Sequence, residues 1–125
     1  MVRSKRPCFG KIGSERMSEK IRAIVKRPDE RYGHVTNISN SLKNLQRIVD
    51  GPIETVPIGD RMVCICNEEG KIRGLDKNFI IRYSSIPHID VIVGEVAIVG
   101  VDGEEFCDCP IDFSVWKRLI EQWGN

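Results

Sequence analysis

The sequence has no apolar run long enough to cross a membrane. Its longest run, Val91–Val101, is interrupted by Gly94, Glu95 and Gly100, whereas a membrane-spanning helix needs about 20 consecutive apolar residues. The basic start of the chain also lacks the roughly 7 to 15 apolar residues that form the centre of a signal peptide. We therefore expect a cytoplasmic protein that makes no contact with membranes.

The motifs of several common enzyme classes are absent as well. The sequence has no Walker A loop for phosphate, no glycine fingerprint for dinucleotides and no His-Glu-x-x-His motif for zinc. The two histidines, His34 and His88, lie in no recognisable nucleophile motif. The sequence therefore identifies no reaction, and it favours a protein without enzymatic activity.

Length and composition predict a single domain that follows a short arm. The 125 residues, 41% of them hydrophobic, match the usual size of one domain. Residues 1–16 show neither helical nor strand periodicity and are rich in Arg, Lys, Ser and Gly, so we expect a flexible basic arm or an extension from an upstream start codon. Residues 17–125 are predicted to form a single α+β domain. The sequence leaves open whether translation starts at Met1 or Met17.

The basic arm offers one alternative for function, which is direct binding of nucleic acid. Phe9 could stack on a base, and five basic side chains could contact phosphates. These basic residues are Arg3, Lys5, Arg6, Lys11 and Arg16. A chain that used them in this way would be a small nucleic-acid-binding regulator.

Hydrophobic periodicity after the arm predicts an α+β fold. Strands are expected over residues 21–27, 34–38, 53–58, 62–66, 91–101 and 106–109. Helices are expected over residues 42–50, 77–83 and 113–123. We expect Gly94 to form a bend or bulge within its strand, and Gly59-Asp60 to form a two-residue hairpin turn. The expected architecture is a small, mostly antiparallel sheet with the two main helices packed on one face.

Four cysteines form two matched pairs, Cys64-x-Cys66 and Cys107-x-Cys109, each on a predicted strand. Because side chains alternate along a strand, both members of a pair lie on one face. Three interpretations are open: buried core thiols, a structural zinc site in which four thiolates converge, or disulfides. Residues i and i+2 of a strand are less suited to zinc than a pair carried by a tight turn. We therefore expect core thiols, and neither a metal nor another cofactor.

Charge is distributed unevenly, although the formal net charge is only +1. Residues 1–31 carry ten Lys and Arg against four acids, whereas no Lys or Arg occurs between Arg82 and Lys117. That stretch holds seven acids, and five of them are our candidates for contacts with a basic partner: Glu95, Asp102, Glu104, Glu105 and Asp108. A face of one sign speeds association with a partner of opposite charge. The alternative is a solvated surface without a partner.

Three of these acids also suggest a catalytic alternative. Asp102, Glu104 and Glu105 could hold Mg²⁺ or Ca²⁺ in a divalent-metal hydrolase. Their spacing does not match an EF-hand loop, and no basic residue lies near them in the sequence to bind a phosphate. We therefore rank the binding interpretation above the hydrolase.

A succession of short motifs resembles a known family. In order, these are residues 45–51 (Leu-Gln-Arg-Ile-Val-Asp-Gly), 53–57 (Ile-Glu-Thr-Val-Pro), 67–71 (Asn-Glu-Glu-Gly-Lys) with Gly74, Leu75 and Asn78, and then 92–94, 98–100 and 103–106. Their order over residues 20–123 is similar to the family catalogued as domain of unknown function 3846, found in phages and bacterial mobile elements. The resemblance implies a short α+β domain with no established activity and no catalytic residues to transfer.

By analogy with other small phage proteins, we expect a non-enzymatic accessory protein that binds a basic host protein through the acidic face. Such a protein could inhibit a defence system or a nucleic-acid-handling system of the host. The sequence leaves the identity of the partner and the oligomeric state open.

Overall fold

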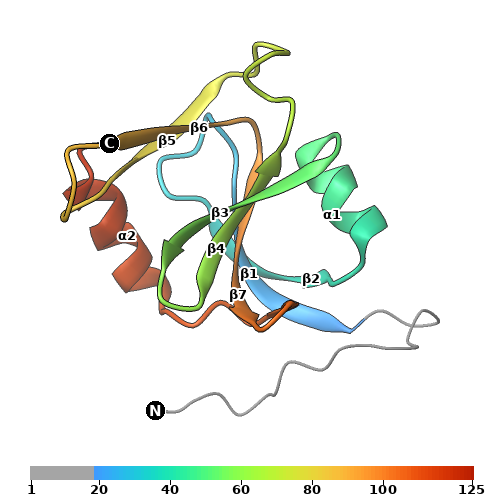
Figure 1. Ribbon diagram of the computed structural model, residues 1–125. Helices are drawn as coiled ribbons and strands as arrows, with labels where there is room; N and C mark the ends of the chain where they lie inside the picture. The colour runs from blue at the N-terminus through green and yellow to red at the C-terminus, as the bar shows by residue number, and fades with distance from the viewer. Residues whose placement is uncertain (1–18) are drawn as a thin grey trace.

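The computed structural model describes residues 19–125, which form eight strands and two short helices (Figure 1). The strands are β1 (Lys20–Lys26), β2 (His34–Ser39), β3 (Ile53–Gly59), β4 (Met62–Asn67), β5 (Lys77–Arg82), β6 (Ile89–Val93), β7 (Val96–Asp102) and β8 (Glu105–Cys107). The helices are α1 (Leu42–Val49) and α2 (Phe113–Gln122). The arm predicted at residues 1–16 lies outside the described residues. No helix in the described part of the chain is long and apolar enough to span a membrane.

Six of the strands form one antiparallel sheet with β7 at its centre. The strand order is β2-β1-β7-β4-β3, and β8 pairs with the end of β7. Ile98 of β7 lies between Ile24 of β1 and Cys64 of β4 in the register of the sheet. The two remaining strands, β5 and β6, form a separate antiparallel ribbon.

Both faces of the large sheet are buried at its centre. Every residue of β4 is buried, and so are residues 96–100 of β7. Continuous apolar strands of this kind are typical of sheets that are covered on both faces. Because side chains alternate, Val63 and Ile65 belong to a core shared with α1, whereas Cys64 and Cys66 belong to a second core shared with α2 and the ribbon.

The expected architecture of two helices on one face of a small sheet is wrong. The α1 helix packs through Leu45 and Val49 on one face, and α2 packs through Trp116 and Ile120 on the other (Figure 1). Strands hold 44% of the described residues and helices only 17%, so the fold is dominated by its sheets. The physical reason is that both faces of the central strands are apolar, so each face needs an element to cover it.

Two further predictions, both for the region of the ribbon, are wrong. The segment predicted as a helix over 77–83 is strand β5, in which Phe79 and Ile81 are buried and both ends are exposed. The strand predicted over 91–101 divides at Gly94 into β6 and β7. Gly94 has φ 78°, a left-handed conformation that glycine adopts without strain. The chain therefore leaves the ribbon at this glycine and enters the centre of the large sheet.

The turn between β3 and β4 also differs from the expectation. It is made by Asp60 and Arg61, and Arg61 has φ 59°. The register of the hairpin shifts between Pro57 and Gly59. This irregularity moves the turn one residue beyond the predicted Gly59-Asp60 pair.

The helix predicted before Gly51 is confirmed as α1. Its first turn is capped by Ser41, whose Oγ accepts the Asn44 N–H at 3.2 Å. The end of the helix is joined to β4 by the buried Asn67, whose Nδ2 donates to the carbonyls of Val49 and Asp50, each at 3.0 Å. These contacts fix the end of β4 that borders the groove described below.

Candidate interaction groove

A groove of about 450 Å³ lies between the β3–β4 hairpin and β6. Residues 54–57 of β3 and residues 90–93 of β6 face each other across it, and residues 66–68, Lys71 and Ile72 complete the lining. The two walls belong to different sheets, so no strand ladder closes the space between them. The volume is within the range of about 300–1,000 Å³ that is common for binding sites.

Cys66 contributes an apolar, polarizable surface to the groove. Its side chain is only 7% exposed, and it lies on the same face of β4 as the fully buried Cys64. A hydrogen bond from the Cys64 thiol lowers the pKa of Cys66, while burial and the nearby Glu54 oppose this shift. Burial raises the pKa of Cys64 well above its usual value. Cys66 is therefore the more acidic thiol of the pair and the one that faces the groove.

Acidic side chains predominate around the opening of the groove. We call Glu54, Glu68 and Asp90 the acidic rim; one basic residue, Lys71, also lines the groove. Glu54 and Glu68 are exposed, and Asp90 is half-buried. Hydrogen bonds from Tyr83 and Cys64 lower the pKa of Asp90 and that of Cys66, and the charge of Lys71 adds a smaller effect in the same direction. The rim therefore has more negative than positive charge, and Lys71 offsets it only in part.

Asp90 is held in place by two neighbours on the ribbon. The Tyr83 hydroxyl donates to Asp90 Oδ2 at 2.6 Å, and His88 Nε2 lies 3.1 Å from Asp90 Oδ1. The Tyr83 and His88 rings stack with their centroids 5.7 Å apart. The hydrogen bond from Tyr83 lowers the pKa of Asp90, while burial together with this carboxylate raises the pKa of Tyr83 to about 12. Asp90 therefore keeps its negative charge in a fixed position.

The acidic block predicted from the sequence does not form one face. Asp102, Glu104 and Glu105 lie together at the turn between β7 and β8. Glu95 precedes β7 and so lies at the opposite end of this strand, roughly 20 Å away at about 3.3 Å per residue. Asp108 accepts the Arg22 N–H at its Oδ1, at 2.8 Å, so it takes part in the internal bonding of the sheet. The predicted acids are therefore close in the sequence but do not all lie close together in the fold.

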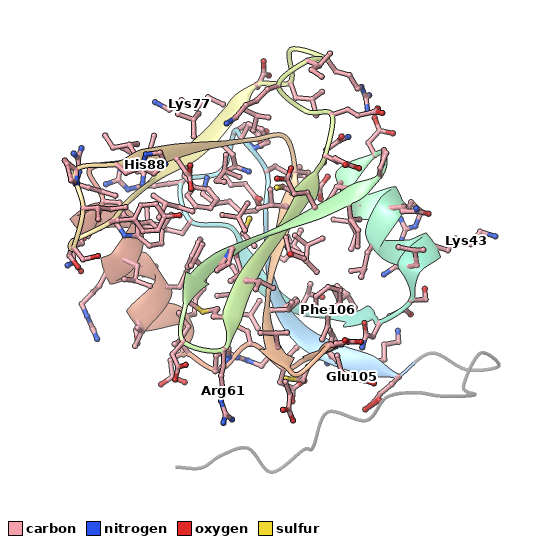
Figure 2. The ribbon with its side chains drawn as sticks, viewed as in Figure 1. Lys43, Arg61, Lys77, His88, Glu105 and Phe106 are labelled. Carbon is pink, nitrogen blue, oxygen red and sulfur yellow. The ribbon has the colours of Figure 1, made fainter. Side chains whose placement is uncertain are left out.

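The turn that carries three of the predicted acids adjoins a second turn. The Val101 N–H donates to the carbonyl of Arg61 at 2.9 Å, which brings the β3–β4 turn beside the end of β7. Figure 2 shows Arg61 and Glu105 at the same end of the molecule, away from His88 on the ribbon. Asp60, Asp102 and Glu104 are exposed there. We call Asp60, Asp102, Glu104 and Glu105 the acidic turns.

The cysteine pairs do not converge as a four-thiolate site requires. Strand β7 lies between β4, which carries Cys64 and Cys66, and β8, which contains Cys107 and is followed by Cys109. Cys64, Cys66 and Cys109 are buried free thiols in the core on the α2 face. Within residues 19–125, no group of three or more His, Cys, Asp or Glu side chains is arranged to hold a metal ion. The same finding applies to Asp102, Glu104 and Glu105, the candidates for a hydrolase.

Lys26 has a buried position that was not expected from the sequence. It ends β1 with a side chain only 2% exposed. Its Nζ donates to the Glu30 carbonyl at 2.7 Å and to Asn78 Oδ1 at 2.6 Å. Burial lowers the pKa of Lys26, although the charges of Glu30 and Asp29 act in the opposite direction. A lysine at the end of a predicted strand usually indicates a solvated position, so no local signal could have identified this one.

Asn78 completes the contact between β1 and the ribbon. Its Nδ2 donates to the Lys26 carbonyl at 2.9 Å and to the Gly94 carbonyl at 2.7 Å. Asn78 therefore joins β1, β5 and the corner between β6 and β7. These polar contacts help to fix the ribbon, and with it one wall of the groove.

Comparison with known proteins identifies the family of this fold. A search of curated proteins found no match, and a search of solved structures found none either. A scan of protein families matches residues 21–123 to the family described as Domain of unknown function (DUF3846). The match extends from β1 to α2 and so includes both sheets and both cores. The chain therefore belongs to the domain of unknown function 3846 family, as the order of its motifs indicated.

Proposed function

We propose that this chain is a non-catalytic binding protein, and that the groove between β3 and β6 receives part of a basic partner protein. The supporting observation is the composition of the groove, in which apolar side chains such as Val56 and Cys66 lie within the acidic rim. A charged cleft with apolar walls attracts partners of opposite charge and speeds their association. Apolar contacts inside the cleft then supply affinity.

The groove provides little of what covalent catalysis needs. Cys66 is a nucleophile, but no histidine is among the described residues that line the groove. The Asp90 carboxylate is already bonded to Tyr83 and His88. Because covalent catalysis usually needs a nucleophile and a base within hydrogen-bond reach of each other, binding accounts for this site better than turnover.

The proposed partner is a host protein, and the proposed setting is a phage or mobile element. The setting comes from the resemblance of the motifs, and the choice of a basic partner comes from the charge of the groove. Proteins that handle nucleic acid carry basic surfaces for phosphate, and such surfaces complement an acidic rim. By covering such a surface, the chain would inhibit a defence system or a nucleic-acid-handling system.

The acidic turns support the same class of partner. They lie at the turn end of the β3–β4 hairpin, beyond Pro57, whereas Glu54 and Glu68 of the acidic rim lie toward its other end. A basic protein large enough to cover the hairpin could therefore contact the acidic rim at one end and the acidic turns at the other. The sequence-based expectation of an acidic contact surface is retained here for Asp102, Glu104 and Glu105.

Affinity measurements on charge-reversed variants test this proposal. The partner is captured from host lysate and identified, and its binding to the purified chain is then measured. Combining Glu54→Lys with Glu68→Lys is expected to weaken binding by about tenfold or more, because attraction is replaced by repulsion. Lys71→Glu removes the basic residue of the groove and is expected to strengthen binding. Lys43→Glu, on the exposed side of α1, is the matched control and is expected to change little.

Two further variants separate the alternatives. Combining Glu104→Lys with Glu105→Lys measures the contribution of the acidic turns independently of the groove. Capture of an acidic partner, or an affinity that is unchanged by reversal at both surfaces, would contradict the proposal. Deletion of residues 1–16 tests the basic arm: if only this truncation abolishes binding, and the ligand is nucleic acid, the chain is a regulator that uses the arm.

A further inference from the structure

The two edges of the β5–β6 ribbon differ in their hydrogen bonding. On β5 the edge at Ile80 is occupied by a side-chain amide: the Ile80 N–H donates to Asn125 Oδ1 at 2.7 Å, and Asn125 Nδ2 donates to the Ile80 carbonyl at 3.0 Å. The amide thus supplies the acceptor and the donor that a neighbouring strand would supply. The backbone of Ile80 must therefore point away from β6.

The residue opposite Ile80 on β6 is Val91. In an antiparallel pair, two opposite residues either exchange both hydrogen bonds or both direct their backbone groups outward. The N–H and C=O of Val91 therefore point away from β5. The same alternation predicts a hydrogen-bonded pair three residues further along, between Tyr83 and His88. The Tyr83 N–H does donate to the His88 carbonyl, at 3.3 Å. Nothing outside the ribbon, within residues 19–125, bonds to the outward backbone groups of Val91, so this edge of β6 is open.

Strand β3, on the opposite wall of the groove, is a less suitable edge for strand pairing than β6. The Glu68 N–H donates to the Pro52 carbonyl at 2.8 Å. Hydrogen-bonded pairs alternate along the register from there, so the backbones of Ile53, Thr55 and Pro57 point outward from β3. Proline has no N–H, and prolines on edge strands hinder pairing with a further strand. The edge of β3 is therefore broken at Pro57, whereas β6 contains no proline and offers the better partner to a strand that enters the groove.

Exposed apolar side chains accompany the open edge. Ile72 is 89% exposed and Val91 is 36% exposed, and both line the groove beside Val93. Proteins usually protect a free edge with charges, prolines or a covering element, because an apolar open edge pairs readily with another chain. Most of the charges around this edge are acidic, since Asp90 precedes Val91 and the remainder of the acidic rim lies across the groove, and Lys71 is the one basic residue of the lining.

We infer that the open edge of β6 binds an extended segment of the basic partner protein, which adds to the ribbon as a third strand and fills the groove. This inference rests on the proposed function, because it assigns the segment to the same groove. Hydrogen bonds to the Val91 backbone hold the segment, and its side chains alternate in direction. One set packs on Val56 and Cys66, and basic side chains reach the acidic rim. The segment is therefore one in which apolar residues alternate with Lys or Arg.

A synthetic peptide of this pattern tests the inference on the full chain. The probe is acetyl-Lys-Val-Thr-Val-Lys-Val-Thr-Val-Lys-amide, titrated while amide NMR signals and amide hydrogen exchange are recorded. We expect saturable shifts at Val91 and its β6 neighbours, and exchange of the Val91 N–H slowed by about tenfold or more when the peptide is bound. The same peptide with Glu in place of Lys is expected to bind about tenfold more weakly or worse, because the acidic rim repels it.

Matched proline variants locate the binding edge. Val91→Pro removes the outward N–H of Val91 and no N–H that pairs with β5, and it is expected to abolish peptide binding. Val91→Thr keeps this N–H and is expected to bind. Val35→Pro on β2 is the control. The Asn40 N–H donates to the Glu19 carbonyl at 2.8 Å, so the Val35 N–H also points outward by register, and Val35 is likewise an exposed valine, at 40%. The Val35→Pro variant is expected to bind the peptide as the wild-type chain does.

A second experiment does not depend on whether Val91→Pro folds. Methylating alternate backbone nitrogens of the peptide, on the edge that would face β6, removes its donors, and we expect this peptide not to bind. No saturable shift at millimolar peptide, or shifts confined to β2, would overturn the inference. So would self-association of the chain through β6 that Val91→Pro abolishes, because the occupant would then be a second copy. Binding of the purified partner that depends on the acidic rim but not on Val91→Pro would overturn strand addition and leave the proposed function intact.

Discussion

Replacing Lys26 by Met removes a charge that is buried at the end of β1 but keeps a side chain of similar length and apolar character. In the folded protein the Lys26 Nζ donates to the Glu30 carbonyl at 2.7 Å, to Asn78 Oδ1 at 2.6 Å and, more weakly, to the Asn78 carbonyl at 3.4 Å. None of these acceptors is a carboxylate. The ammonium is therefore stabilised by hydrogen bonds rather than by a direct ion pair.

The size of the effect follows from the acceptors that lose their donor. A buried acceptor left without a partner costs about 1–3 kcal/mol. Lys26→Met leaves the Glu30 carbonyl and Asn78 Oδ1 without a hydrogen-bond donor. It also removes the cost of desolvating a charge, which offsets part of the lost stability. We expect the free energy of unfolding to fall by about 2 kcal/mol at pH 7.

The sign of the pH dependence follows from the lowered pKa of Lys26. Between this lowered value and the unfolded-state value of about 10.4, the unfolded chain binds a proton that the folded chain does not. The stability contributed by Lys26 therefore rises with pH across that window and is smaller below it. The destabilisation caused by Lys26→Met should grow as the pH approaches 10.

Urea denaturation, followed by the fluorescence of the buried Trp116 and Trp123, measures both effects between pH 7 and pH 10. Lys20→Met, at the exposed start of β1, is the matched control and should change the stability by no more than about 0.5 kcal/mol. A Lys26→Met variant as stable as wild type would refute the hydrogen-bond argument. A destabilisation that shrinks as pH rises would show that the nearby acids, and not burial, determine the pKa of Lys26.

Three other outcomes are expected. Asn67→Ala should lower the free energy of unfolding by about 2–4 kcal/mol in the same assay, because it leaves the Val49 carbonyl and the Glu69 N–H without partners and the Asp50 carbonyl with Arg73 alone; a loss below about 0.5 kcal/mol would contradict this. Cys66 should react with iodoacetamide faster than Cys64 in the folded protein, as read by mass spectrometry, because its pKa is lower and it borders the groove. Tyr83 should ionise near pH 12 by ultraviolet absorbance, and Asp90→Asn should lower this pKa; an unchanged titration would refute the contact.

The positions of the two main helices could be predicted from local patterns, but the side of the sheet on which each packs was predicted wrongly. The apolar spacing of α1 and α2 is a local feature, and the structure confirms both helices. A usable signal for the second covered face was present in β4, where Met62 to Cys66 is an uninterrupted apolar run. Such a run indicates a strand buried on both faces. Interpreted in this way, the run would have predicted that another element packs on each face of β4.

The groove could not have been found from the sequence, because its walls depend on the division of one apolar run. Residues 91–101 look like a single strand, and only the backbone conformation at Gly94 sends β6 to the ribbon and β7 to the large sheet. The acidic residues failed as a guide for a related reason. Glu95 and Asp102 are close in sequence, but β7 keeps them at opposite ends of a strand. Pairing between strands that are distant in sequence produces no periodic pattern in the sequence.

The central position of β7 also has an evolutionary consequence. Its consecutive side chains alternate between two cores, so Ile98 shares its surroundings with α2 and the ribbon, whereas Val99 shares its surroundings with α1. Substitutions at these adjacent positions have different neighbours to compensate for a change in volume. In an alignment of family members, co-variation should therefore connect Ile98 with Trp116 and Ile120, and Val99 with residues of α1. Each face of the sheet can then drift in sequence largely independently of the other, although one strand serves both.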